Sequence, residues 1–407
     1  MKFLFLCGNA NHARMFGTLR GALSERGIGE QVFLSLDDLK REGASRALCE
    51  LGINPTEFGA FGVLSAEKVL REIRPSILVV GNDFSPTESA FVLAARKLAV
   101  PTVLVQDGFI ESPYKEGRVL ARRLFPYLLR FPRYVYNYLF HVRALADASG
   151  FAVALRGSTR DISARLRATH AYGSGSCDAV AVMGEQARDY FHSIGIPLEK
   201  IFITGKLPDV SQPPREIVEL MRAKFAGKGE RLVVFASTNL EDIGLGGRER
   251  ADVLEMLAAS AGCMDSLSLV IKLHPMENVD WHRQMLDGRK NVVVTRDDPI
   301  YPLVCAADLV VTEISTVGFE AGRLGIPVAA ITLFVGKRAD ALIRAGAWEV
   351  KSGEGLSKLL TRLATDREGL RADFEDNNRF SSVIAKTERM ASENVSELLV
   401  LKARGTR

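Results

Sequence analysis

Three groups of polar residues follow strongly apolar runs of this sequence. Asp107 comes shortly after the run PTVLV, His274 after LVIKL, and the pair Ser315 and Thr316 after LVVTEI. In parallel α/β sheets, ligands bind at the carboxyl ends of strands, where loops meet helix N-termini. These positions are therefore the first candidates for a functional site.

His274 is the candidate acid. Histidine titrates near neutral pH, so it can donate a hydrogen bond or a proton to the phosphate of a leaving group. Pro275 fixes its φ angle and turns the chain at once, which favours a position in a crevice over a hydrogen bond to a neighbouring loop. Three more polar residues near strand ends are candidates for binding the nucleotide or its phosphate: Lys272, Ser237 and Thr238.

Ser315 and Thr316 begin a predicted helix, TVGFEAGRL. Their hydroxyls and the unpaired N–H groups of the first turn favour an anion at the positive end of the helix dipole. The alternative is an ordinary helix N-cap. Glu320, one turn further, is suited to accept hydrogen bonds from ribose hydroxyls, and its alternative role is that of a solvated surface carboxylate.

Asp107 is the candidate general base, because a carboxylate at a strand end can deprotonate an acceptor hydroxyl. The alternative is a turn aspartate beside Gly108. Asp83 follows the apolar run SILVV in an equivalent position, so either carboxylate fits the role of base. The loop after the first strand adds candidates on the acceptor side: Asn9, Asn11 and His12.

The sequence contains no motif for a bound cofactor or metal. A P-loop, HExxH and GxSxG are all missing, and the first loop lacks GxGxxG spacing. The five cysteines are scattered, without CxxC spacing, which predicts neither a zinc site nor a disulfide framework. We therefore expect no metal, no cofactor, and a location in the reducing cytoplasm.

The elements that must position these residues alternate between apolar runs and helical patterns. In the first half we predict strands at 2–6, 31–34, 76–80, 101–105, 179–183 and 201–204, and helices at 12–26, 66–73 (capped by Ser65), 88–98 and 184–194. In the second half we predict strands at 232–236, 267–273, 292–294, 309–312 and 327–331, helices at 249–261, 299–306 and 316–324, and further helices within 355–401. Such alternation is typical of doubly wound parallel sheets buried on both faces.

The chain of 407 residues is longer than one hydrophobic core of about 250–300 residues supports. Residues 210–215 contain two of the 15 prolines and are the predicted linker. We therefore predict an acceptor-side domain at 1–208, a domain for the nucleotide donor at 209–385, and a helical tail at 386–407.

The charge of the chain is unevenly distributed. The net charge is +4, but residues 115–167 carry 11 Lys or Arg and three acids.

No apolar run reaches the roughly 18–20 residues of a membrane-spanning helix, so we expect neither such a helix nor a signal peptide. Seven aromatic residues lie between Phe125 and Phe140, among the cations of residues 115–145. This pattern favours peripheral contact of 115–145 with an anionic membrane surface; single-stranded nucleic acid and an interdomain core are the alternatives, and we expect no nucleic-acid partner.

The order of four segments resembles a known group of enzymes. VAVMGEQARDYF, KIFITGKLPD, LVIKLHPMEN and AADLVVTEISTVGFEAGRLGIPV resemble the GT-B enzymes of bacterial surface-polysaccharide assembly, over nearly the whole chain. The pattern is most similar to that of bacterial sialyltransferases and capsule Kdo transferases, with an acidic pair before glycine, an HP dipeptide and a Ser-Ser or Ser-Thr pair. Gln106 departs from it, because the sialyltransferase pattern has an acid there.

This resemblance implies two Rossmann-like, doubly wound α/β domains that face a central cleft. It implies that Asp107 is the base, His274 the acid or phosphate contact, and Ser315 with Thr316 the phosphate binder. The expected function is transfer of a sugar, such as a CMP-activated sialic acid or Kdo-type sugar, from a nucleotide donor to a cell-surface glycan or lipid-linked acceptor. The alternatives are a polyol-phosphate transferase of the CDP-glycerol type, a UDP-sugar 2-epimerase, and an inactive binding module of a polysaccharide assembly complex.

Overall fold

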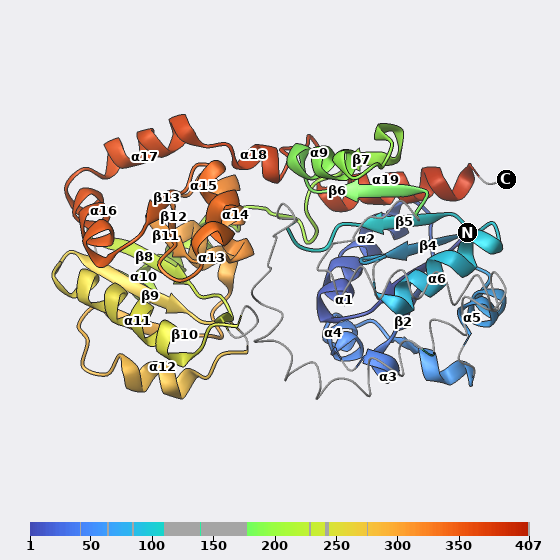
Figure 1. Ribbon diagram of the computed structural model, residues 1–407, viewed down its shortest axis with the longest axis horizontal. Helices are drawn as coiled ribbons and strands as arrows, with labels where there is room; N and C mark the ends of the chain where they lie inside the picture. The colour runs from blue at the N-terminus through green and yellow to red at the C-terminus, as the bar shows by residue number, and fades with distance from the viewer. Residues whose placement is uncertain are drawn as a thin grey trace. The chain divides into compact units, whose positions relative to one another are not determined.

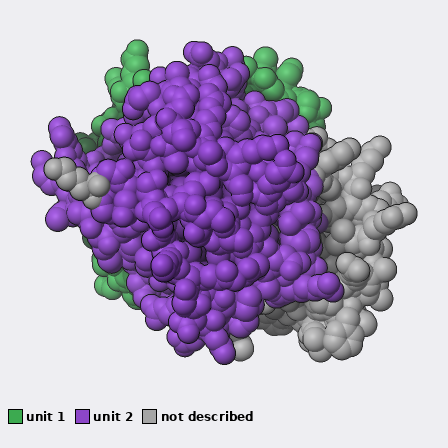
Figure 2. Space-filling model, turned by 90° about the vertical axis from the view of Figure 1, so that its left-hand side faces the viewer, with its two compact units in different colours: residues 1–209, 385–407 green, residues 210–384 purple. Residues whose placement is uncertain are grey.

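The structure is a computed structural model that describes residues 1–109, 139 and 177–405, apart from 41, 63, 64, 84, 228, 241–243 and 275. The chain forms two compact units, coloured separately in Figure 2. The first unit combines Met1–Asp209 with Ala385–Arg407, and the second is Val210–Ile384. Residues 115–145, for which we predict membrane contact, lie outside the described residues except for Leu139.

The first unit is built on a parallel sheet of seven strands in the order β3-β2-β1-β4-β5-β6-β7 (Figure 1). The strands are β1 (Lys2–Cys7), β2 (Glu30–Ser35), β3 (Thr56–Glu57), β4 (Ile77–Val80), β5 (Thr102–Val105), β6 (Ala179–Val182) and β7 (Ile201–Ile203). In β1, Phe3 and Phe5 enter one core cluster, whereas Leu4 and Leu6 enter another. Alternate side chains of a strand point to opposite faces, so β1 is buried on both faces, as its continuous apolar run predicts.

Among the described residues, the helices of the first unit are α1 (Ala10–Gly17), α2 (Leu19–Glu25), α3 (Asp37–Lys40), α4 (Ala44–Glu50), α5 (Ala66–Ile73), α6 (Pro86–Lys97), α9 (Glu185–Ser193) and α19 (Ala391–Arg404), with short 3₁₀ turns at Phe58–Phe61 and Leu198–Lys200. The prediction of one helix over 12–26 is wrong. Thr18 separates α1 from α2, and its hydroxyl donates to the Met15 carbonyl. Ser65 caps α5 as predicted, because its hydroxyl accepts from the N–H of Lys68.

The second unit is built on a parallel sheet of six strands in the order β10-β9-β8-β11-β12-β13. The strands are β8 (Arg231–Ala236), β9 (Leu267–Lys272), β10 (Val292–Thr295), β11 (Leu309–Thr312), β12 (Val328–Ile331) and β13 (Trp348–Val350). The helices are α10 (Arg215–Phe225), α11 (Gly247–Gly262), α12 (Val279–Met285), α13 (Ile300–Ala306), α14 (Thr316–Arg323), α15 (Asp340–Arg344), α16 (Gly353–Thr365), α17 (Arg367–Asn377) and α18 (Phe380–Val383), with a 3₁₀ turn at Gly336–Ala339. β13 is not among the predicted strands, because Glu349 at its centre leaves no continuous apolar run.

The predicted fold class is confirmed: two Rossmann-like parallel sheets, each built from strands that alternate with helices. In Figure 1 the red helix α19 lies among the elements of the first unit, although it follows the whole second unit in sequence. Its residues Val395 and Leu399 belong to the same core cluster as Phe3 and Phe5. None of the helices in the described part of the chain is long and apolar enough to span a membrane.

Candidate functional site

In the second unit, three neighbouring strands end beside one another and carry most of the predicted phosphate-binding residues. The central strand β8 pairs with β9 on one side and β11 on the other. His274 follows β9, Ser237 follows β8, and Ser315 follows β11. The chain order reverses direction between β8 and β11, and such a switch point is where open α/β sheets bind ligands.

A buried arginine connects the loops that follow these strands. Arg250 of α11 has its Nε 3.2 Å from Glu277 Oε1 and its Nη1 2.8 Å from Glu313 Oε1. It also donates to the carbonyl of Thr238. The three side chains of Arg250, Glu277 and Glu313 are at most 9% exposed. We call these three residues the Arg250 cluster.

Glu277 connects the Arg250 cluster to two of the predicted residues. Its Oε2 accepts from the Ser237 hydroxyl at 2.6 Å and from the His274 backbone N–H at 2.8 Å. Its Oε1 lies 3.5 Å from Nε2 of His282, a buried histidine of α12. The backbone of the HP loop is therefore fixed by the same carboxylate that binds Arg250.

The two carboxylates of the Arg250 cluster differ in pKa. Burial raises the pKa of Glu313 to about 7, against the opposing effects of Arg250 and the Thr238 N–H. Burial also tends to raise the pKa of Glu277, but His282, Arg250 and Ser237 together hold it below its ordinary value. Glu277 is therefore an anion at neutral pH, whereas Glu313 can gain or lose a proton there.

Ser315 is the N-cap of α14, and its hydroxyl accepts from the Val317 N–H at 3.3 Å. The predicted alternative, an ordinary N-cap, thus describes its contact in this structure. Thr316 is the first residue of the helix. Glu320 is buried on α14, so the alternative of a solvated surface carboxylate is wrong.

Two more predicted phosphate ligands have partners within the protein. Lys272 is buried, and its ammonium donates to the carbonyls of Arg296 at 2.6 Å and Leu273 at 3.3 Å. Burial lowers the pKa of Lys272, while Asp297 and Asp298 oppose the shift. Thr238 donates its N–H to Glu313 Oε2 at 3.3 Å and belongs to the surroundings of the Arg250 cluster.

In the first unit, the structure brings two predicted residues into contact. His12 Nε2 of α1 lies 3.2 Å from Asp107 Oδ2, in the loop after β5. The imidazole is only 1% exposed, whereas the Asp107 side chain is 26% exposed. Strand β4 lies between β1 and β5, and Gly81 at its end packs against the imidazole. A Cβ at Gly81 would lie 2.5 Å from His12 Cδ2, so glycine makes room for the ring.

The hydrogen bonds of His12 define its tautomer. Its Nδ1 accepts from the Gly8 N–H at 3.3 Å, so the proton of the neutral imidazole is on Nε2 and points to Asp107. Asp107 is the more exposed member of the pair. The arrangement is suited to proton removal by the carboxylate, with the buried histidine fixing its orientation.

The other predicted residues of the first unit have different surroundings. Asn9 caps α1 by accepting from the His12 N–H at 2.8 Å, and Asn11 is exposed. Asp83 is buried after β4. Gln106 accepts from the Met183 N–H at 2.9 Å and donates to the Gly108 carbonyl at 3.0 Å, so it fixes the loop that carries Asp107.

Sequence reasoning missed the Arg250 cluster. A local signal existed for Glu313, which interrupts the apolar run LVVTEI two positions before Ser315. Glu277 follows the HP dipeptide by two positions. Arg250 has no local signal, since its surroundings in sequence, GGRERAD, are typical of a solvated helix start.

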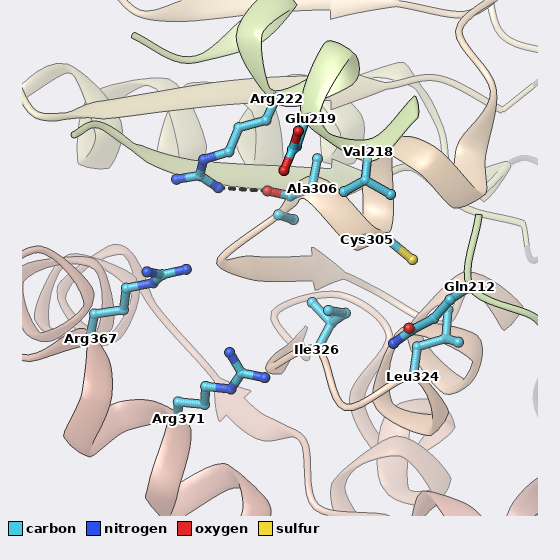
Figure 3. A pocket seen from close by; sticks show the side chains of 11 residues that line it. Gln212, Val218, Glu219, Arg222, Cys305, Ala306, Leu324, Ile326, Arg367 and Arg371 are labelled. Carbon is cyan, nitrogen blue, oxygen red and sulfur yellow. Dashed lines mark hydrogen bonds between the residues drawn. The ribbon is translucent and has the colours of Figure 1, made fainter. Parts of the chain in front are cut away.

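A separate cavity of about 360 Å³ lies at the other end of β11 (Figure 3). Arg222 of α10 and Arg367 and Arg371 of α17 line it, together with Cys305. Arg222 and Arg367 both bind the buried carboxylate of Asp308, at 2.8 and 2.6 Å. These ion pairs connect α10, β11 and α17 at the amino end of the strand, away from the predicted phosphate-binding residues.

No protein-family model matches the sequence, and a search of curated proteins finds no relative. Solved structures do match the fold. The UDP-GlcNAc 2-epimerase from Neisseria meningitidis, bound to UDP-GlcNAc, is 16% identical, with a TM-score of 0.61 over 98% of this chain and 100% of that one. The spinosyn forosaminyltransferase SpnP is 14% identical, with a TM-score of 0.57 over 99% of both chains. Anabaena HepE, in complex with UDP and glucose, is 14% identical, with a TM-score of 0.56 over 98% of this chain and 100% of that one.

These similarities define the fold. The chain has the GT-B fold, which UDP-GlcNAc 2-epimerases and glycosyltransferases share. The expected GT-B architecture is therefore confirmed. At these identities the similarity extends to the fold alone, so no narrower family follows from it.

Proposed function

We propose that this protein is an enzyme that acts on a UDP-sugar. The diphosphate binds at the N-terminus of α14, where Ser315 and Thr316 lie at the switch point of the second sheet. The His12–Asp107 pair removes a proton during the reaction. UDP is the proposed nucleotide because structures of this fold contain UDP-GlcNAc or UDP with glucose.

The observation that carries the proposal is the His12–Asp107 contact. A buried, neutral imidazole donates to a partly exposed carboxylate at the carboxyl end of a parallel sheet. This geometry keeps one carboxylate oxygen oriented for proton removal. It also favours Asp107 over Asp83 as the base, because Asp83 is buried.

The reaction that we propose first is epimerisation at C2 of the sugar. Its support is that a UDP-GlcNAc 2-epimerase matches this chain over nearly the full length of both proteins. Inversion at C2 requires that the C2–H bond break and re-form. In the proposed reaction Asp107 takes the C2 proton while the C1–O bond to UDP breaks, which leaves a C1=C2 double bond. UDP then adds back at C1 as a proton from solvent returns to the opposite face of C2. His274 is the proposed donor to the leaving phosphate oxygen.

An NMR experiment tests this reaction. The protein is incubated with UDP-GlcNAc in D₂O, and we expect a second sugar nucleotide with deuterium at C2. Asp107→Asn should lower the rate by about 10²- to 10⁴-fold. Asp189→Asn is the matched control, because that side chain is 67% exposed and pairs with its neighbour Arg188, so it should keep the rate. Unchanged UDP-GlcNAc without deuterium would contradict epimerisation.

Glycosyl transfer is the second candidate. A separate observation favours it, namely the sequence order of the HP dipeptide and the Ser-Thr pair, which resembles bacterial sialyltransferases. In transfer, Asp107 would remove the proton of an acceptor hydroxyl. Mass spectrometry after incubation with CMP-, UDP-, GDP- or CDP-activated donors, with and without a surface-glycan acceptor, separates the two reactions. Product mass that depends on the acceptor supports transfer.

A further inference from the structure

We propose that binding of the UDP diphosphate beside α14 is coupled to uptake of one proton by the Arg250 cluster, with Glu313 as the group protonated. The inference rests on the proposed function, because it needs the diphosphate at Ser315 and Thr316. It adds a regulatory property of that site: nucleotide affinity depends on pH through a residue that does not itself bind the nucleotide.

The charge balance of the Arg250 cluster is the first argument. Two carboxylates share one guanidinium, so the cluster has a charge of −1 when all three groups are ionised. Arg250 lies between them, and the side chains are nearly inaccessible to water. A buried net charge is unfavourable, so one added proton relieves the excess. Burial with a pKa of about 7 for Glu313 agrees with this argument.

The position of Glu313 is the second argument. Glu313 directly follows β11 and precedes the N-cap Ser315 by two residues. Its Oε2 accepts from the Thr238 N–H, in the loop after the adjacent strand β8. An anion bound at the start of α14 is therefore held by residues only two or three positions away in sequence from this carboxylate. A nearby negative charge raises the pKa of a carboxyl group, so bound diphosphate favours the protonated form.

Other charged groups surround the Arg250 cluster. Arg250 faces Glu313 from α11, and Glu277 faces Arg250 from the loop after β9. His282 faces Glu277 from α12, and its Nδ1 is 2.7 Å from the Asn278 carbonyl. Since a carbonyl only accepts, Nδ1 carries a proton, and Nε2 is a second place where the cluster could take up a proton. The experiment must therefore distinguish Glu313 from His282.

Isothermal titration calorimetry with UDP tests the coupling. At pH 8 the free Glu313 is about one-tenth protonated, whereas at pH 6 it is about nine-tenths protonated. Titrations in HEPES and in Tris, which differ in ionisation enthalpy, give the number of protons taken up. We expect nearly one proton per UDP at pH 8, where UDP itself is fully ionised.

The variant Glu313→Gln imitates the protonated carboxyl group. We expect it to take up no proton and to bind UDP about tenfold more tightly than the wild type at pH 8, because its competent form is always populated. At pH 6 the two affinities should agree. Glu255→Gln is the matched control, since Glu255 is 53% exposed on α11 and pairs with Arg289. It should behave as the wild type does.

The possible outcomes separate the inference from the proposed function. UDP binding by the wild type without proton uptake would overturn the coupling and leave the proposed function intact. No binding at millimolar UDP would overturn both. Uptake that persists in Glu313→Gln but disappears in His282→Asn would overturn the assignment to Glu313. If Glu313→Gln does not fold, the wild type still decides the matter. Between pH 7 and 8, where UDP stays largely ionised, its UDP affinity must fall about fivefold, and a constant affinity overturns the coupling.

Discussion

Replacement of Gly81 by alanine tests the contact between His12 and Asp107 without touching either side chain. The new Cβ would lie 2.5 Å from His12 Cδ2 and 2.6 Å from Nε2. The imidazole cannot avoid it easily, because it is buried and bonded through Nδ1 to the Gly8 N–H. We expect the ring to be displaced.

The size of the effect follows from these distances. Ordinary contact begins at 3.4 Å, so the ring or the strand must yield by about 0.9 Å. The bond between His12 Nε2 and Asp107 Oδ2, now 3.2 Å, then exceeds hydrogen-bonding distance. Overpacking of this kind costs about 1–3 kcal/mol of unfolding free energy. A displacement of about 1 Å in a catalytic group can lower the rate about 10²-fold.

Urea unfolding and turnover of the sugar nucleotide measure the two effects. Gly21→Ala is the matched control, because its Cβ would have no neighbour within 4 Å on the exposed side of α2. Alanine is the better helix former by about 1 kcal/mol, so the same substitution should stabilise the protein there. In a His12→Ala background the cost of Gly81→Ala should largely disappear. Full activity and unchanged stability of Gly81→Ala would refute the reasoning.

Three more predictions concern other parts of the chain. The pKa of Glu313 is raised from 4.5 to about 7 in the folded state, so the folded protein binds more protons than the unfolded chain between these pH values. The unfolding free energy should therefore fall by about 3 kcal/mol from this group as pH rises from about 4.5 through 7. Urea titrations should show a smaller fall for Glu313→Gln. Ser315→Ala should lose about 0.5–2 kcal/mol through the missing N-cap, whereas Ser315→Thr should keep most of it in the same assay. For residues 115–145, sedimentation with anionic vesicles should show binding at low salt and release at high salt. A variant in which four arginines are replaced by glutamine should lose this binding: Arg122, Arg123, Arg130 and Arg133. Equal pelleting of the wild type and this variant would contradict the membrane prediction.

Much of the fold could be predicted because buried parallel strands are continuous apolar runs. The strand at 309–312 and the helix at 66–73 agree with the structure residue by residue. The apolar signal fails for the short strands β3 and β13, where Glu57 and Glu349 leave no continuous apolar run. It also fails at Thr18, where a hydroxyl bonded to the preceding turn separates two helices.

The contacts of the candidate site could not be predicted in the same way. His12 and Asp107 are 95 positions apart, and Arg250 and Glu313 are 63 apart. Each pair meets because particular strands are neighbours in a sheet, and strand order is a property of the tertiary fold. Sequence position therefore named His12 and Asp107 singly as candidates, but it could not indicate that they form a pair.

The last residues of the chain belong to the unit that contains its first residues. Val210–Ile384 is thus an insertion within the first unit, whose core is completed only when α19 contributes Val395 and Leu399. During synthesis from the N-terminus, the second unit has all of its residues before the first unit does. Folding of the His12–Asp107 unit must therefore wait until α19 has been synthesised, and loss of α19 would damage the core that contains Phe3 and Phe5.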